Sequence, residues 1–165
     1  MTDMSSRGVS QMPKASENRI LDTMIELSRC SRNDRIILAG AASSGRIVDW
    51  QRRGYRRVAT TATCRLPDAR YGVACIEWRH RSIKALEATL DWLVHFLSAN
   101  AVLVIWTDAA ISTAPGRREL RGALERFGFA VDTGTRCENG FAISARRRAA
   151  ADNNHSDAVR QTVAA

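Results

Sequence analysis

Side chains that could take part in catalysis or ligand binding follow two apolar segments of this 165-residue chain. Glu77 and His80 come at and just after the end of one segment, and Trp106 and Asp108 come at the end of another. A carboxylate or an imidazole in such a place can act as a general base, and a tryptophan can stack on a ligand. Glu77 and Asp108 are therefore the candidate catalytic residues. The alternative, favoured for His80, is that the tryptophans close the core and the charged groups are solvated loop ends.

The stretch GAASSG, residues 40–45, joins a short apolar segment to a helix-like pattern. Turns of this kind hold nucleotides in many α/β proteins and only reverse the chain in others. A P-loop is excluded, because Arg46 and Ile47 stand where the phosphate-binding lysine and the magnesium-binding hydroxyl are required. The G-x-G-x-x-G pattern of dinucleotide-binding proteins is absent as well.

The formal net charge is +8, and nearly all of the positive charge is arginine. Two arginine clusters stand out, at residues 46–57 and 145–148. A basic surface attracts polyanions, so nucleic acid is a possible partner. We favour the simpler interpretation of a solvated helix face and a basic tail, because no aromatic residues alternate with these arginines as in a single-strand platform.

The sequence indicates neither a secretory leader nor a membrane span. The first fifteen residues are polar, and the longest apolar run, residues 101–106, is far shorter than the roughly 20 residues that a span needs. The four cysteines are scattered and lack the close spacing of metal ligands. We expect a soluble, cytoplasmic protein with no membrane partner and no bound metal.

Helix and strand patterns alternate along most of the chain. Apolar residues at helical spacing predict helices over residues 16–30, 43–54, 83–97 and 113–128. Apolar or β-branched runs predict strands over residues 35–39, 56–64, 71–78, 101–106, 129–135 and 140–146. Residues 16–148 then form a single domain, between a disordered leader (1–15) and a disordered tail (149–165) of small polar residues.

This order of elements predicts an α/β fold. The first four strands are separated by crossover segments, which gives a mostly parallel sheet with helices on both faces. The last two strands are joined by RCEN, residues 136–139, which is too short for anything but an antiparallel hairpin. The sheet is therefore expected to end in a C-terminal antiparallel β-hairpin.

With these features the chain resembles the class I S-adenosylmethionine-dependent methyltransferases. LRGALERFGFAVDTGTRCENGFAISARRR, residues 120–148, is similar to the family's closing helix, Gly-Phe step and hairpin. LPDARYGVACIEW, residues 66–78, looks like the family's Leu-Pro segment leading into a strand, and FLSANAVLVIW, residues 96–106, looks like its Leu-x-Pro-Gly-Gly turn. The resemblance covers residues 35–148 and implies a Rossmann-like domain, trimmed because the segment before Tyr71 is short.

The resemblance also implies S-adenosylmethionine as the cofactor and assigns residues to it. Gly40, Ala41 and Gly45 correspond to the loop after the first strand, and Thr60 and Thr61 to the ribose-binding end of the second. Glu77 or Asp108 would supply the base that some methyl transfers need.

The chain departs from the family at the cofactor loop and at the ribose-binding position. Ala39 replaces the acidic residue before the glycine-rich loop, and two threonines replace the ribose-binding acid. Two functions follow from these differences. One is a small methyltransferase-like protein with weakened or lost activity on an unidentified small-molecule or macromolecular substrate. The other is a non-catalytic α/β module that binds a protein or a polyanion.

Overall fold

The computed structural model describes residues 14–40, 43–64, 70–137 and 139–148. Residues 1–13 of the predicted leader, the predicted tail and Ala41 lie outside the described residues. Lys14 and Ala15, which fall within the predicted leader, belong to the first helix. The helices are α1 (Lys14–Ser28), α2 (Ser43–Arg52), α3 (Ile83–Leu93) and α4 (Ala114–Arg126), with a 3-10 turn η1 (Val94–Phe96). The strands are β1 (Ile36–Gly40), β2 (Val58–Thr60), β3 (Tyr71–Trp78), β4 (Leu97–Asp108), β5 (Phe129–Cys137) and β6 (Gly140–Arg147).

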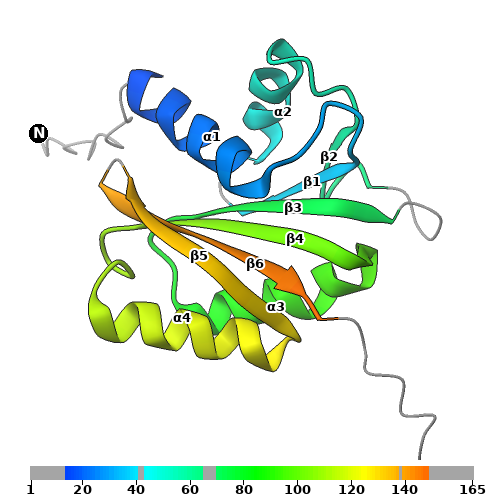
Figure 1. Cartoon of the computed structure of the whole chain (residues 1–165). Helices are drawn as coiled ribbons and strands as arrows, with labels where there is room; N and C mark the ends of the chain where they lie inside the picture. Colours follow the sequence, from blue (N-terminus) through cyan, green and yellow to red (C-terminus); the bar gives the residue numbers. More distant parts are fainter. Residues whose placement is uncertain (1–13, 41–42, 65–69, 138, 149–165) are drawn as a thin grey trace, which may run out of the picture.

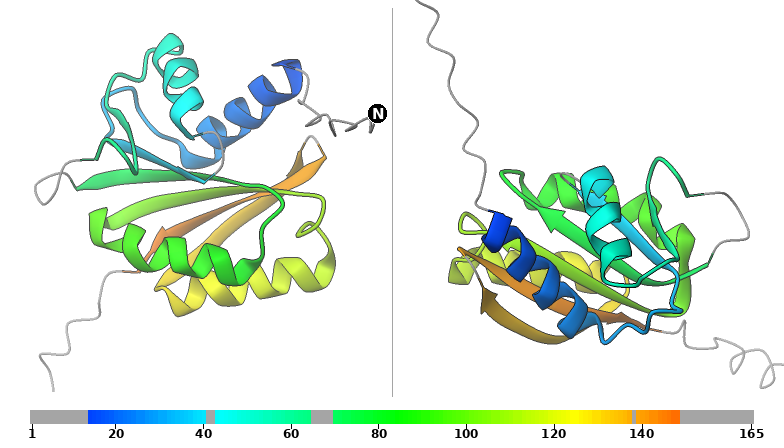
Figure 2. Two further views of the ribbon diagram at one scale, coloured as in Figure 1. Left: turned by 180° about the vertical axis from the view of Figure 1, so that it is seen from behind. Right: turned by 90° about the horizontal axis from the view of Figure 1, so that it is seen from above.

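The strands form one sheet in the order β2-β1-β3-β4-β6-β5. The pairs β1–β2, β1–β3 and β3–β4 are parallel, whereas β6 is antiparallel to both β4 and β5. Figure 1 shows α1 and α2 above the sheet and α3 and α4 below it, and the views of Figure 2 agree. The predicted α/β fold, with a mostly parallel sheet, helices on both faces and a closing antiparallel hairpin, is confirmed.

Two apolar layers hold the helices to the sheet. Leu86 and Leu90 of α3 and Leu120 and Leu124 of α4 are buried on one face. On the other face α1 and α2 pack against the sheet in a second cluster. Its buried members are Ile20, Leu21, Met24, Ile36, Leu38, Trp50, Tyr55, Val73, Cys75, Val104, Trp106 and Ala142. Alternate residues of β3 and β4 enter opposite clusters, which explains why both strands read as continuously apolar.

Local signals in the sequence set most of the element ends. The Ser82 hydroxyl accepts from the Ala85 N–H and begins α3, and the Thr113 hydroxyl accepts from the Gly116 N–H and begins α4. Gly128, with φ +80°, follows α4 in the left-handed conformation that terminates helices.

Some predicted elements have other bounds in the structure. The helix predicted over residues 83–97 ends at Leu93 and is followed by the turn η1, and the strand predicted over residues 101–106 extends from Leu97 to Asp108.

The strand predicted over residues 56–64 is limited to Val58–Thr60, because the chain turns after Thr60. The Thr63 N–H and the Cys64 N–H both donate to the Thr60 carbonyl, at 3.0 and 2.8 Å, and close this turn. β-branched residues are common in strands, but here they stabilise a turn through side-chain hydroxyls.

No helix within the described residues is both long and apolar enough to cross a membrane.

Candidate functional site

The carboxyl ends of the parallel strands lie along one edge of the sheet, where open α/β sheets bind ligands. The register pairs Gly40 of β1 with Glu77 of β3, and Glu77 with Trp106 of β4. Asp108 ends β4 two residues further on, and Thr60 ends β2 on the other side of β1. The predicted candidates therefore share an edge, although they are spread over four strands.

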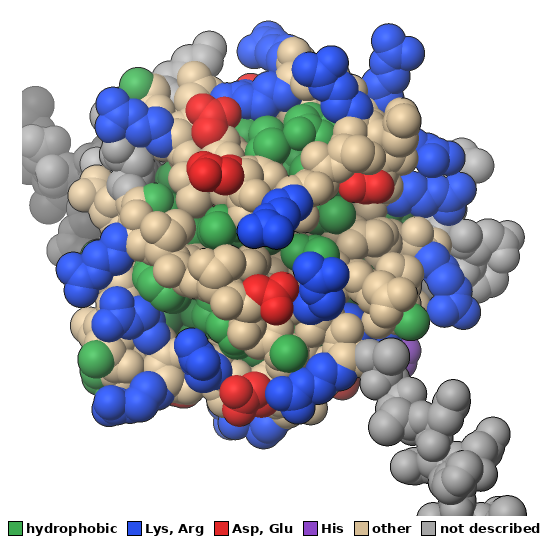
Figure 3. Space-filling model, in the orientation of Figure 1, with side chains coloured by type: hydrophobic (Ala, Val, Ile, Leu, Met, Phe, Trp, Pro, Cys, Tyr) green, Lys and Arg blue, Asp and Glu red, His purple; other side chains and the backbone are tan. Residues whose placement is uncertain are grey.

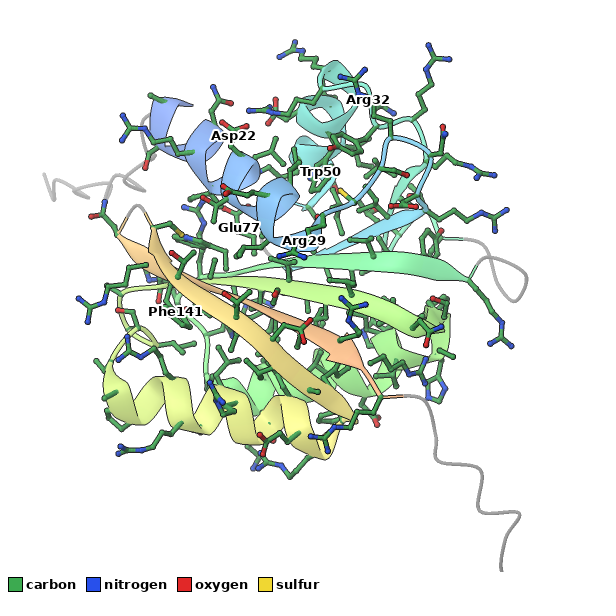
Figure 4. The ribbon with its side chains drawn as sticks, in the orientation of Figure 1. Asp22, Arg29, Arg32, Trp50, Glu77 and Phe141 are labelled. Atoms are coloured by element: carbon green, nitrogen blue, oxygen red, sulfur yellow. The ribbon has the colours of Figure 1, made fainter. Side chains whose placement is uncertain are left out.

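Glu77 is buried and forms a bidentate ion pair with Arg46. Its side chain is 5% exposed and that of Arg46 is 10% exposed. Arg46 Nε donates to Glu77 Oε2 at 2.9 Å, and Arg46 Nη2 donates to Glu77 Oε1 at 3.0 Å. Arg79 also donates to Glu77 Oε1, so two cations share one carboxylate. Figure 4 shows Glu77 between α1 and the sheet, away from the outer surface.

Arg46 connects three elements. Besides the β3 carboxylate, its Nη1 lies 3.9 Å from Glu17 Oε2 of α1 and 3.7 Å from Asp49 Oδ2, one turn along α2. The same nitrogen donates to the Glu17 carbonyl at 3.4 Å. A guanidinium can serve several acceptors at once because its five N–H donors are arranged as a planar fork. Arg46 therefore fixes α1 and α2 against the carboxyl edge of the sheet.

The surrounding charges determine the protonation of Glu77. Burial alone would raise the pKa of this carboxyl, but the hydrogen bonds and charges of Arg46 and Arg79 outweigh burial, so its pKa lies below the ordinary range. A carboxylate held in its charged form by two arginines is a weak proton acceptor. The predicted role of Glu77 as a base remains a prediction, and its contacts are those of a structural ion pair.

The space beside this ion pair is small. A cavity of about 20 Å³ lies between α1, α2 and the sheet, with lining residues that include Leu38, Ser43, Arg46, Trp50 and Glu77. That volume holds about one water molecule, whereas ligand pockets measure some 300–1,000 Å³. Trp50 is 1% exposed and packs edge-on against Tyr55 at 5.1 Å between ring centres. This part of the edge is therefore closed by protein.

Asp108 is engaged by the loops that follow β3 and β4. Its Oδ2 accepts from the His80 N–H at 2.7 Å and lies 3.2 Å from His80 Nδ1, and its Oδ1 accepts from the Ala110 N–H at 3.1 Å. His80 has φ +52°, an uncommon conformation for a residue other than glycine, and the Asp108 carboxylate stabilises it. The structure thus brings His80 and Asp108 together, with the aspartate bracing a turn.

An open cleft of about 400 Å³ lies over these loops. Its lining residues are Arg79, His80, Trp106, Asp108, Ala109, Ala110 and Asn139. The Arg79 guanidinium lies 4.9 Å from the centre of the Trp106 ring, and Trp106 is 1% exposed. Trp78, which ends β3 and could also stack on a ligand, donates to the Ser82 carbonyl and belongs to the core.

Four of the candidate cofactor residues, Gly40, Gly45, Thr60 and Thr61, lie within the described residues, and the local structure shows what surrounds each of them. Gly40 has φ +91°, and a β-carbon there would lie 2.2 Å from the Glu77 carbonyl oxygen, so β3 itself requires glycine at this position. A β-carbon at Gly45, in the first turn of α2, would meet no atom within 4 Å. Thr60 is 1% exposed, and its hydroxyl lies 3.3 Å from that of Thr63. Thr61 is exposed in the turn that follows.

The pairing of Arg46 with Glu77 is not among the contacts that the sequence predicts. The two residues are 31 positions apart, and Arg46 was grouped with a surface charge cluster. A signal was nevertheless present: a glutamate at the end of an apolar strand has to find a cation when the strand is buried on both faces. The first turn of the following helix is the nearest place from which an arginine can reach it.

Comparisons with known proteins agree with the fold. No family model and no curated protein matches the sequence. Among solved structures, an S-adenosylmethionine-dependent methyltransferase from Mesorhizobium loti is 13% identical, with a TM-score of 0.55, over 81% of this chain and 99% of that one. The 1,6-didemethyltoxoflavin-N1-methyltransferase of Burkholderia thailandensis is 16% identical, with a TM-score of 0.57, over 80% and 83% of the two chains.

A third similar structure, the [4+2]-cyclase SpnF, is 11% identical with a TM-score of 0.61, over 86% of this chain and 85% of that one. At such identities the likeness concerns the fold. The chain has the methyltransferase-like Rossmann fold of these proteins, and one of them is named for a reaction other than methyl transfer. Function therefore has to be argued from the site.

Proposed function

We propose that this chain is a methyltransferase-like domain that does not transfer methyl groups and acts as a binding module. The observation that carries this proposal is the commitment of the carboxylates at the ends of β3 and β4. Glu77 is held by two arginines, and Asp108 is held by the turn containing His80. Both carboxylates therefore have partners within the fold.

S-adenosylmethionine does not fit the residues that the structure describes at this edge. Its ammonium and sulfonium groups are cationic, and they would approach a network in which Arg46 and Arg79 already occupy the glutamate. Its ribose diol would meet Thr60 and Thr61, which carry no charge, and the Thr60 hydroxyl is buried against Thr63. The N-terminal turn of α2 remains suited to an anionic group. A site for the whole cofactor would also have to bind its cationic groups and its ribose.

The decisive experiment is isothermal titration calorimetry with S-adenosylmethionine and with S-adenosylhomocysteine. We expect no heat of binding at millimolar ligand, and no ligand-dependent rise in Tm. An active methyltransferase measured in parallel verifies the ligand stocks. Saturable binding by the parent chain would overturn the proposal.

Thr60→Val/Thr61→Val is the matched variant for that case. If the parent binds and this variant does not, the ribose contact is at the end of β2, and the chain is better described as a methyltransferase-like protein that retains its cofactor. If both bind equally, the ribose contact lies elsewhere.

A further inference from the structure

A basic groove runs between α4 and the β5–β6 hairpin, on the face of the sheet opposite α1 and α2. Arg117, Arg118 and Arg121 line an open cleft of about 410 Å³ together with Ala114, Phe141 and Ile143. A second cleft of about 610 Å³ is lined by Arg136 and by Ala109, Ser112, Thr113, Cys137, Asn139 and Gly140. Thr113 of one cleft is adjacent in sequence to Ala114 of the other, and Gly140 is adjacent to Phe141; we call the two clefts together the α4–hairpin groove.

The arginines of this groove are available to an anion. Within the part of the chain that the structure describes, Arg117, Arg118, Arg121 and Arg136 form no ion pair. All but Arg117, which is half-buried, are exposed. Figure 3 shows blue side chains gathered over the lower left of the molecule, where Figure 1 places α4. An unneutralised row of cations attracts a polyanion.

The cluster that stood out in the sequence, residues 46–57, is different. Arg46 pairs with Glu77, Arg53 Nη2 lies 2.8 Å from Asp22 Oδ1, and Arg52 Nη1 lies 3.9 Å from Asp49 Oδ1. Three of the five arginines of this cluster therefore have a carboxylate partner within the fold, whereas Arg56 and Arg57 are exposed and form no ion pair with a described residue. In the α4–hairpin groove none of the four arginines has a carboxylate partner among the described residues.

An aromatic ring lies among the unpaired arginines. Phe141 of β6 is half-buried, and its ring fills the space above Gly134 of β5, where a β-carbon would lie 2.5 Å from Phe141 Cζ. The Arg117 guanidinium lies 5.3 Å from the centre of this ring. Figure 4 shows Phe141 where the hairpin approaches the beginning of α4. A ring and a guanidinium are planar groups on which a nucleobase can stack.

We infer that the α4–hairpin groove binds single-stranded nucleic acid. The arginines contact successive phosphates, and an unpaired base stacks on the surface formed by Phe141 and Arg117. A duplex is a poorer fit because its bases are already stacked on one another and cannot reach a recessed ring. An acidic protein would satisfy the arginines but would make no use of the ring. The inference deepens the proposed function, on which it rests for the role of a binding module, by naming the partner.

Binding can be measured by fluorescence anisotropy with a labelled oligothymidine of about 12 nucleotides. Four phosphate contacts on a single strand give a slope of about −2.8 in log K against log salt, so affinity should fall about 50-fold between 50 and 200 mM salt. Arg117→Gln/Arg121→Gln leaves two contacts and should reduce that fall to about 7-fold. Arg52→Gln/Arg53→Gln removes the same charge from the paired cluster and should leave the fall near 50-fold.

The aromatic contribution is tested separately. Phe141→Leu should weaken binding by about 5-fold or more at constant salt, and a melting curve shows whether the variant is folded. Arg117→Lys keeps the charge but loses the planar group, and it gives the same test without altering the core. Polyglutamate at equal charge should compete poorly with the oligothymidine.

Equal losses in both arginine pairs, undiminished binding by Phe141→Leu and Arg117→Lys, or full competition by polyglutamate would overturn the inference in favour of unspecific attraction or an acidic protein partner. No binding at 50 mM salt would overturn it outright. The calorimetry with S-adenosylmethionine is independent: binding of that ligand by a chain that also binds the oligonucleotide at this groove would remove the proposed function alone.

Discussion

Replacing Arg46 with methionine should destabilise the protein strongly, because the Glu77 carboxylate would stay buried with one arginine beside it instead of two. Glu77 is 4% exposed, and Arg79 would be its remaining cation. Removing one partner of a buried pair costs about 3–5 kcal/mol, and the presence of Arg79 favours the lower end, about 3 kcal/mol. For a chain of this size that corresponds to a fall in Tm of roughly 6–12 °C.

The assay is urea denaturation followed by far-ultraviolet circular dichroism, for the parent, Arg46→Met, Glu77→Gln and the double variant. In the double variant both members of the pair are uncharged, so no buried carboxylate is left without its arginine. The double variant should therefore be more stable than Arg46→Met alone. Arg52→Met is the control: its side chain is 68% exposed and 3.9 Å from Asp49, so the change should be within about 0.5 kcal/mol.

The pH dependence gives the reasoning a second test. The pKa of Glu77 is lowered in the folded state, so its pairing stabilises the fold above the ordinary value of 4.5 and is lost as the pH falls through the lowered pKa. The difference between parent and Arg46→Met should therefore be largest near neutral pH and should shrink in acid. A difference that does not change with pH, or a double variant as unstable as Arg46→Met, would refute the ion-pair account.

Three further outcomes are expected. Gly40→Ala should cost at least about 1–3 kcal/mol in urea denaturation, because φ is +91° and the β-carbon would lie 2.2 Å from a carbonyl oxygen of β3; Gly45→Ala, where the β-carbon meets nothing, is the control. Arg147→Met should lower stability by about 1–3 kcal/mol, since the Arg147 guanidinium donates to the carbonyls of Val94 and Leu97 at 3.0 and 2.7 Å, and equal stability of variant and parent would contradict this. Burial raises the pKa of the Cys75 thiol well above its ordinary value, so iodoacetamide should label it in urea and not in the native state at pH 8, as read by mass spectrometry; native labelling would show that β3 opens readily.

The helices, the strands and their order could be predicted from the sequence, because they depend on local and periodic patterns of apolar residues. Tyr71–Trp78 is a strand with the predicted bounds, and the hairpin follows from the brevity of its turn. The site was less readable, since it depends on where side chains point. The resemblance assigns Thr60 to a ribose contact, which stays a prediction; the structure adds that its hydroxyl lies 3.3 Å from that of Thr63, a contact that the strand pattern does not indicate. The partnership of Arg46 with Glu77 depends on how α2 is rotated over the sheet, which periodicity does not specify.

The same limit applies to the aromatic platform. No aromatic residue alternates with the arginines along the sequence, and this argued against binding to single strands. Phe141 comes from β6 and Arg117 from α4, and they meet only because the hairpin folds back beside that helix. Composition along the chain describes neighbours in sequence, whereas a binding surface is made of neighbours in space.

The position of β6 has a consequence for biosynthesis. β6 lies between β4 and β5, and β5 has no other partner in the sheet. A nascent chain that has not yet exposed Gly140–Arg147 outside the ribosome can pair its four parallel strands but must leave β4 with an open edge and β5 unattached. Open edges invite pairing with other chains. Translation of this protein therefore includes an interval in which β4 has an unpaired edge that can misassemble with other chains, and this interval ends when β6 pairs with β4.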